Sequence, residues 1–348
     1  MLLSAENHCK GSLPPPQAGG WAAGGMRRWR GPLLLAAALG ICGYLVALAL
    51  VDRARLGAAL AQLRPATLGA VLGLSLLNYA LRFLRWHGYT RTLGASVPLG
   101  RHLLYYLAGF AFTVTPGKSG EAVRALYLRP HGLAYTQSLA VLLVERLLDI
   151  LAVSLLALLW LLHDRSAGLL AALAVLALLG GAYWLAQPAA QRGLQRAAER
   201  RSGQLARGLS FLAHSAGDAA RLLHPARLAS GLALGLAAWA AEGYGLYLIA
   251  SALGIPLDPA GAIGAYSLAV LAGAASFIPG GLGGAEAAMT ALLVHGGAQA
   301  ATALAATLVC RLATLWFAVL LGVASLLWLE LSGAGLKPGH LGQGTPAP

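Results

Sequence analysis

The sequence predicts an all-α polytopic membrane protein with about six full spans and two re-entrant helical hairpins in an inverted repeat. Hydrophobic residues make up 58% of the 348 residues and charged residues only 11%, well below the roughly 25% charged residues of soluble domains. A broken apolar segment occurs twice, as TPGKSGE over Thr115–Glu121 and IPGGLGGAE over Ile278–Glu286. In each copy an arginine, Arg146 or Arg311, follows the glutamate at the same spacing within apolar sequence.

The basic charge of the chain fits a membrane protein better than a nucleic-acid-binding protein. The formal net charge is +13, but the arginines flank apolar runs and do not alternate with aromatic residues on a polar surface. Cys9, Cys42 and Cys310 have no disulfide or metal-ligand spacing, and the nine histidines form no metal-binding pair. We therefore expect no metal, no other cofactor and no nucleic-acid partner.

Six runs are expected to form full spans, since crossing a bilayer takes about 20 apolar residues. The expected spans are 33–51, 67–85, 135–162, 167–186, 228–253 and 300–329. The second is short as an apolar run, so we expect its helix to continue through Arg82 and Arg85, with both side chains reaching the membrane interface. Segments 1–31 and 331–348 are expected to be disordered tails.

The two broken segments predict re-entrant hairpins. The run Leu103–Thr115 and its continuation, Glu121–Leu128, are both much shorter than a span, so neither can cross a bilayer alone. The second hairpin is expected over 260–278 and 284–294. Proline and glycine break helices at both tips, and such backbone is tolerated at membrane depth only where protein or a water-filled cavity covers it.

The distribution of basic residues gives the expected orientation. With six spans, two hairpins and both termini in the cytoplasm, the inside segments carry 19 of the 25 lysines and arginines and the outside segments carry four. The alternative of eight transmembrane helices places 116–135 and 188–227 outside, against the preference of basic residues for the cytoplasmic side. We therefore expect a multi-pass protein of the inner (cytoplasmic) membrane.

The same topology gives the domain organisation. One transmembrane domain is expected over 32–330, with repeat one at about 65–163 and repeat two at about 226–330. An echo supports this pairing, because Arg82 precedes Leu93-Gly94 by the same interval that separates Glu242 from Leu253-Gly254. Inverted repeats with broken helices are a recurring plan of secondary transporters.

Residues 188–227 form the expected basic connector between the repeats. Leu205, Leu209, Leu212 and Ala216 recur at helical spacing among arginines, which is typical of a helix lying on a membrane surface. A solvated connector explains the pattern equally well.

The hairpin tips are candidate anion sites. A helix that starts at a Pro-Gly tip has free backbone N–H groups and a favourable dipole for negative charge, and Lys118 adds a full positive charge. The structural alternative is that the glycines only permit a tight turn and that Glu121 pairs with Arg124. The repetition of the motif favours a functional tip. The tip residues are Pro116, Gly117, Gly120, Pro279, Gly280, Gly281 and Gly283.

Charged residues also lie inside the span expected at 135–162. Glu145 and Asp149 share one helix face, and Arg146 is three residues from Asp149, so an ion pair within this helix is geometrically easy. Such a span can neutralise itself without a ligand.

Arg311 is different, because no acidic residue precedes Glu330 on its own helix. Its candidate partners are Glu286, Glu242 or a bound anion. An ionised side chain at membrane depth is a functional hypothesis by default.

Taken in order, these residues resemble the transmembrane region of the lysylphosphatidylglycerol synthase/flippase family, the flippase-like domain proteins of prokaryotic membranes. The resemblance covers residues 33–330 and implies an inner-membrane protein that handles lipids, with members linked to translocation of aminoacylated or glycosylated lipids. The chain ends at Pro348 without a soluble aminoacyl-transfer domain, so lysyl transfer is not expected. The matching residues are Arg82/Arg85-Trp86, Thr115–Glu121, Glu145-Arg146-x-x-Asp149, Pro279–Glu286 and Arg311.

The expected function is the binding of an anionic phospho- or glycolipid head group between the repeats and its movement between leaflets. Lys118, Arg146 and Arg311 would hold the phosphate, and Arg82 and Arg85 would flank the head group. The acidic residues expected to balance charge, relay protons or gate are Glu121, Glu145, Asp149, Glu286 and Glu242.

Two other functions remain open. The first is a membrane-embedded lipid-linked transferase, which a partnered nucleophile or a metal among Glu121, Glu145 and Asp149 would favour. No catalytic motif is present, so we do not expect an enzyme. The second is a non-transporting scaffold of a cell-envelope synthesis complex, with a glycosyltransferase or lipid-modifying enzyme as its partner.

Overall fold

The computed structural model describes residues 57, 61–115, 121–162, 169, 173, 176, 180, 187–276 and 278–332. Regular structure within these residues is helical throughout, with short 3₁₀ and π segments between α-helices. The all-α fold class is therefore confirmed for this part of the chain. The span expected at 33–51, the tail at 1–31, nearly all of the tail at 331–348, and most of the span at 167–186 lie outside the described residues.

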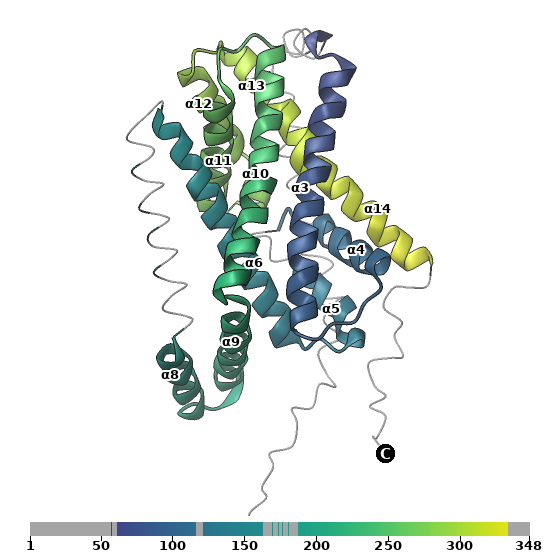
Figure 1. Ribbon diagram of the computed structural model, residues 1–348, viewed down its shortest axis with the longest axis vertical. Helices are drawn as coiled ribbons and strands as arrows, with labels where there is room; N and C mark the ends of the chain where they lie inside the picture. The colour runs from purple at the N-terminus through teal and green to yellow at the C-terminus, as the bar shows by residue number, and fades with distance from the viewer. Residues whose placement is uncertain are drawn as a thin grey trace, which may run out of the picture.

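Repeat one begins with the long helix α3 (Figure 1). A short arm follows, in which α4 is extended by a 3₁₀ turn and stops before the first tip. The returning arm, α5, has only 5 residues and leads through a second 3₁₀ turn into α6. In order, the elements are α3 (Pro65–Thr92), α4 (Leu99–Ala108), η1 (Gly109–Phe112), α5 (Arg124–Leu128), η3 (Arg129–His131), α6 (Tyr135–Ala157) and η4 (Leu158–Leu162).

Repeat two follows the same order of long helix, broken pair and long helix. Its last helix runs from α13 through a π segment into α14 without a break, over Ala300–Leu331. In order, the elements are α10 (Pro225–Ala252), α11 (Pro259–Ala275), η5 (Pro279–Gly281), α12 (Gly284–His295), α13 (Ala300–Arg311), η6 (Leu312–Trp316) and α14 (Phe317–Leu331).

The first helix of each repeat ends in the same turn. Gly94 has φ 100° and Gly254 has φ 69°, a left-handed conformation that glycine adopts without steric penalty. The amide after each glycine reaches back into the last helical turn, as Ala95 N donates to Thr90 O at 3.0 Å and Ile255 N to Ala250 O at 2.9 Å. The long helices α3 and α10 therefore end in the same Schellman pattern.

The second half of each repeat contains another matching turn. Gly132 has φ 86° and Gly297 has φ 97°. The next amide again reaches back in both copies, from Leu133 N to Leu128 O and from Ala298 N to Leu293 O. We call the difference in residue number between two matching positions their offset. The offset that relates Gly132 to Gly297 is slightly larger than the one that relates Gly94 to Gly254. The extra length of repeat two therefore falls within its hairpin.

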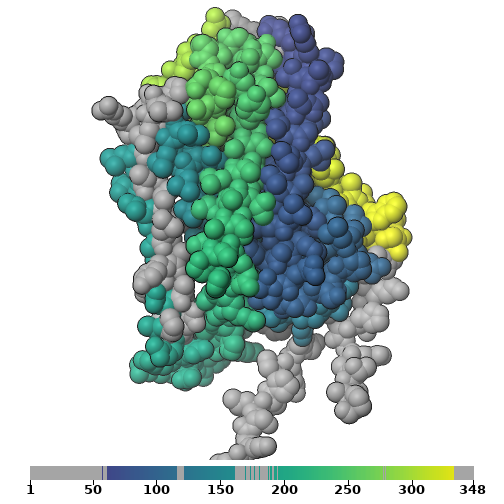
Figure 2. Space-filling model, in the orientation of Figure 1, coloured from purple at the N-terminus to yellow at the C-terminus, as the bar shows by residue number. Residues whose placement is uncertain are grey.

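The two repeats pack against each other through equivalent residues. Helices α3 and α10 run in opposite directions along the length of the molecule (Figure 1) and lie side by side on one face (Figure 2). Asn78 Nδ2 donates to Ala238 O at 2.8 Å, and these two residues are equivalent at the offset that relates Gly94 to Gly254. This hydrogen bond therefore joins two positions that correspond in the expected duplication.

A reciprocal pair of hydrogen bonds joins further corresponding positions. Tyr79 Oη donates to Thr314 O at 2.5 Å, and Trp239 Nε1 donates to Asp149 Oδ1 at 3.3 Å. Tyr79 and Trp239 are equivalent at the offset that relates Gly94 to Gly254. Asp149 and Thr314 are equivalent at the offset that relates Gly132 to Gly297. Each repeat therefore binds the other through the same two positions.

The broken helix pairs lie toward opposite ends of the bundle. In Figure 1, α4 and α5 lie beside the lower half of α3, whereas α11 and α12 lie beside the upper half of α10. The two hairpins meet in between: a Cβ added at Gly280 would lie 3.4 Å from the Cα atom of Val114, near the end of the first arm. The helix bounds agree with the expected arms to within a few residues.

Three described helices are long and apolar enough to cross a membrane, namely Pro65–Thr92, Pro225–Ala252 and Ala300–Leu331. They coincide with three of the expected spans. Helix α6 is 23 residues long and carries Glu145, Arg146 and Asp149 in its middle.

Candidate functional site

Helix α6 brings its acidic residues into the centre of repeat one. Glu145 and Asp149, one turn apart, have 0% and 4% of their surface exposed. Because they share the face that packs against α3 and α10, both carboxylates lie among side chains of neighbouring helices and not toward lipid.

Two arginines of α3 bind this acidic face. Arg85 Nη2 donates to Asp149 Oδ1 at 2.6 Å, and Arg82 Nη2 donates to Asp149 Oδ2 at 3.2 Å. Arg82 and Arg85 are 4% and 2% exposed. The expectation that they reach the membrane interface is therefore wrong, since α3 continues to Thr92 and turns both side chains inward.

Two residues after the first tip complete the cluster. Glu121 is 1% exposed and Arg124 is 4% exposed. Arg124 Nη1 lies 3.2 Å from Glu121 Oε2 and 3.6 Å from Glu145 Oε2. Its Nε donates to the backbone carbonyl of Tyr106 at 3.1 Å, and its guanidinium stacks over the Tyr106 ring at 4.1 Å. Arg124 therefore joins the returning arm to α4 and α6.

Arg146 is the most exposed arginine of the cluster, with 19% of its side chain accessible. Its Nη2 lies 3.0 Å from Asp149 Oδ2 and 3.5 Å from Glu121 Oε2. The ion pair expected between Arg146 and Asp149 is present. The tip residues Pro116, Gly117 and Gly120, together with Lys118, lie outside the described residues.

The repeat-one cluster, which we define as Arg82, Arg85, Glu121, Arg124, Glu145, Arg146 and Asp149, carries a net positive charge. Four guanidinium groups face three carboxylates through the ion pairs above. Burying an ion is costly unless an opposite charge compensates it. A cluster with one more cation than anion, away from bulk water, is chemically suited to an additional anion.

Repeat two holds a smaller, balanced pair. Arg311 Nε donates to Glu286 Oε1 at 2.6 Å, and Arg311 Nη2 donates to the carbonyl of Gly280 at 3.1 Å. Of the three candidate partners, the structure pairs Arg311 with Glu286. The other oxygen of Glu286 accepts the Gly283 amide at 2.7 Å, so one carboxylate ties the tip, α12 and α13 together.

The second tip is built around this pair. Gly280, Gly281 and Gly283 all have positive φ, at 67°, 65° and 83°. The Gly281 amide donates to Ile278 O at 2.8 Å and the Gly283 amide donates to Glu286, so these two N–H groups are engaged within the hairpin. The carbonyl of Gly280, which follows Pro279, faces Arg311.

Glu242, another of the candidate partners of Arg311, forms a hydrogen bond with a tyrosine of α11. It is 5% exposed and its Oε2 accepts from Tyr266 Oη of α11 at 2.5 Å. At the offset that relates Gly94 to Gly254, Glu242 occupies the position of Arg82. No group of three His, Cys, Asp or Glu side chains among the described residues is arranged to hold a metal ion.

Sequence reasoning missed three members of the site environment: Arg124 as a member of the cluster, and Tyr106 and Trp239 as its neighbours. The spacing of Arg124 indicates only a local pair with Glu121, although its position within an apolar stretch after the tip is a further signal. No comparable signal exists for Trp239, because it lies on α10, far from Asp149 in the sequence, and reaches Asp149 only through the packing of α10 on α6.

Comparison with known proteins agrees with this architecture. The family model described as the lysylphosphatidylglycerol synthase TM region matches residues 33–322. A curated relative, a UPF0104 membrane protein of Methanothermobacter thermautotrophicus, is 28% identical over 280 residues, which cover 73% of this chain and 82% of that protein.

Proposed function

The chain belongs to the lysylphosphatidylglycerol synthase transmembrane-region family, and on that basis we propose that it binds the anionic head group of a membrane lipid between its repeats and moves it between leaflets. The protein is a membrane protein of helical architecture. The family membership supports a role connected with membrane lipids, and the chemistry of the repeat-one cluster supports the head-group specificity.

The observation that carries this proposal is the surplus positive charge of the repeat-one cluster. Arg146 is the member through which a ligand would enter, because it is the most exposed of the four arginines and shares its carboxylate partners with Arg82 and Arg124. A lipid phosphate that binds Arg146 would supply the missing negative charge. Lys118 of the first tip would add a second contact to the phosphate.

We assign separate roles to the other candidate residues. Arg82, Arg85 and Arg124 hold Asp149, Glu121 and Glu145 in place and keep the cluster rigid. In repeat two, Glu286 would release Arg311 to a lipid phosphate only when the second tip moves. The carboxylates therefore balance charge in this state and gate access to the arginines.

The membrane topology that accompanies this function has six full spans and two hairpins entering from opposite sides. The arms α4 and α5 are too short to cross, the hairpins lie toward opposite ends of the bundle (Figure 1), and their ends approach each other at Val114 and Gly280. Arg82, Arg85 and Arg124 lie in the core and cannot count as loop charges. Without these three, the basic residues are 16 inside and 4 outside, which still supports cytoplasmic termini.

Cysteine labelling tests this topology. Single cysteines at Pro130 and Arg200 are expected to react only with membrane-permeant reagents in intact cells, because both positions would face the cytoplasm. Labelling of the cysteine at position 130 by an impermeant reagent from outside would exclude the inverted-repeat topology.

Lipid binding by purified protein tests the function. We expect the wild type to retain an anionic phospholipid in native mass spectrometry. Arg146→Gln should weaken its binding by about tenfold, the equivalent of about 1.4 kcal/mol, because the variant has three cationic and three anionic groups in the cluster. Arg91→Gln, which removes an exposed arginine at the end of α3, is the matched control. Equal binding by both variants would show that the cluster does not bind the head group.

A further inference from the structure

The connector between the repeats forms a helical pair at one end of the bundle. Helices α8 (Pro188–Glu199) and α9 (Gly203–Leu222) lie at the end where α3 terminates and α10 begins (Figure 1). Helix α9 packs on α6 and buries Ala213, Ser215 and Leu222. Only two residues separate its end from α10, so α9 cannot move far from a membrane that α10 crosses.

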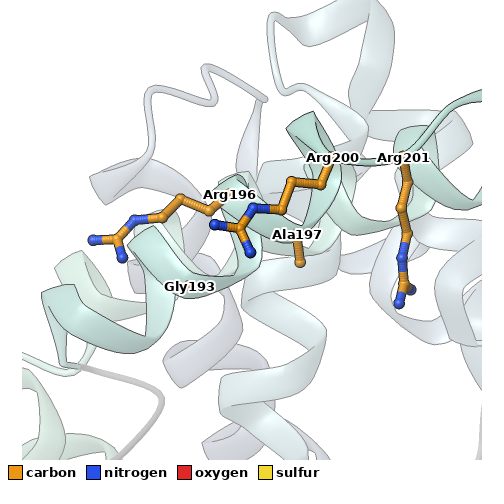
Figure 3. A pocket seen from close by; sticks show the side chains of 5 residues that line it. All are labelled: Gly193, Arg196, Ala197, Arg200 and Arg201. Atoms are coloured by element: carbon orange, nitrogen blue, oxygen red, sulfur yellow. The ribbon is translucent and has the colours of Figure 1, made fainter.

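Three arginines, at the end of α8 and in the turn that follows it, face open space. Arg196, Arg200 and Arg201 line a hollow of about 370 Å³ together with Gly193 and Ala197. Figure 3 shows the Arg196 and Arg200 side chains extending toward the same side and the Arg201 side chain extending in another direction, with no acidic side chain among the lining residues. Within the described part of the chain none of the three forms an ion pair.

The spacing of these arginines is unfavourable for the helix by itself. Arg196 and Arg200 are four residues apart on one face, where like charges repel. Residues 188–227 contain seven arginines and two acidic residues, and one of the acids, Asp218, is paired with Arg221. The other acid, Glu199, ends α8 beside these arginines, so the protein compensates the positive surface only in part.

Exposed apolar side chains lie on the next helix. Leu205 is 56% exposed and Leu212 is 47% exposed, and they lie two turns apart on the same side of α9; Phe211 beside them is 38% exposed. Of the other apolar residues of α9, Ala213 and Leu222 are buried, and Leu209 and Ala216 are half-buried. Basic groups next to large exposed apolar side chains are the composition of a helix that lies in a membrane interface.

We propose that α8 and α9 form an interfacial platform that binds the anionic lipid surface at the end of the bundle where α10 begins. Arg196, Arg200 and Arg201 contact lipid phosphates, while Leu205 and Leu212 enter the apolar edge of the leaflet. Charge complementarity selects anionic lipid as the occupant, and the short link to α10 keeps the platform at the surface. This proposal does not depend on head-group binding in the repeat-one cluster.

The platform is tested with the full chain reconstituted in vesicles. Cys9, Cys42 and Cys310 are replaced, Leu212→Cys is labelled with an environment-sensitive fluorophore, and quenching by brominated lipid is compared between phosphatidylcholine vesicles and phosphatidylcholine–phosphatidylglycerol vesicles. We expect quenching at position 212 to increase by about twofold when phosphatidylglycerol is present. The triple variant Arg196→Gln, Arg200→Gln, Arg201→Gln should lose that increase while keeping the wild-type melting temperature.

A label at His214, an exposed residue on another side of α9, is the matched control and should be little quenched in either vesicle. Equal quenching at position 212 in the two lipid mixtures would overturn the role of the arginines. A label at position 212 that reports water in both mixtures would overturn the platform altogether and would leave the surface to a soluble partner.

Discussion

The two repeats keep one ion pair in common and differ in almost everything that surrounds it. Arg146 with Glu121 and Arg311 with Glu286 are equivalent pairs of identical spacing in the sequence, at distances of 3.5 Å and 2.6 Å. In repeat two the pair is short and self-contained. In repeat one Arg146 shares its carboxylates with three other arginines.

The residues at equivalent positions explain this difference. The repeat-two counterparts of Arg82, Arg85, Arg124, Glu145 and Asp149 are Glu242, Gly245, Met289, Cys310 and Thr314. The shared pair therefore serves to hold each hairpin to its last long helix, which is a structural task that both repeats need. Among the described residues the surplus of positive charge lies in repeat one, and this is why we place the first head-group contact there, at Arg146.

The largest effect is expected at Asp149, the carboxylate that three arginines and Trp239 contact. Asp149→Asn leaves three buried arginines and the partly buried Arg146 with two carboxylates, and it should lower the free energy of unfolding by about 3–5 kcal/mol. Thr314→Val is the matched control at the equivalent position, because the Thr314 hydroxyl only donates to Cys310 O of its own helix. Thermal unfolding in detergent measures both, and similar melting temperatures for the two variants would contradict the comparison.

An intermediate effect is expected at Arg311. Arg311→Leu leaves Glu286 without its cation and should cost about 2–3 kcal/mol, while the protein still inserts and loses lipid-dependent function. Arg311→Lys should rescue poorly, because a lysine cannot reach both Glu286 and the Gly280 carbonyl in the fixed geometry of a guanidinium.

The double variant Arg311→Leu, Glu286→Gln separates the two roles of Arg311. It removes the unpaired carboxylate and should recover much of the stability without recovering lipid binding. Recovery of both in thermal unfolding and native mass spectrometry would show that Arg311 is purely structural.

The smallest effect on stability is expected at the hairpin tips. Gly280→Val forces a β-branched residue into positive φ and places its side chain against Val114, at a cost of about 1–2 kcal/mol. We expect weaker lipid binding from Gly280→Val and from Gly117→Val, measured by native mass spectrometry. Gly180→Val, at an exposed helical position, should change binding little, and equal losses at all three sites would remove the tips from the binding site.

Local patterns in the sequence predicted much of this architecture. The helix breaks at Pro and Gly, the correspondence of Leu93-Gly94 with Leu253-Gly254, and the candidate pair of Glu286 with Arg311 follow from residue types and spacing. These features depend on neighbours in the chain or on a repeated motif, and both are visible without a structure.

The centre of the site was not predictable in the same way. Arg82 and Arg85 lie near the end of an apolar run, where arginines commonly extend to the interface, and their partner Asp149 lies on another helix. Hydrophobic periodicity defines which residues form a helix but gives no register between α3 and α6. The burial of Arg82, Arg85 and Arg124 beside the carboxylates of α6 depends on that register and is evident only from the packing.

Transbilayer movement of a fluorescent anionic lipid in proteoliposomes tests the central claim most directly. We expect the wild type and Arg91→Gln to move the anionic lipid at similar rates, and Arg146→Gln to move it about tenfold more slowly while staying folded, because Arg82, Arg85 and Arg124 still pair with Asp149 and Glu121. Movement of the anionic lipid by Arg146→Gln at the wild-type rate would contradict the assignment of the repeat-one cluster as the head-group site.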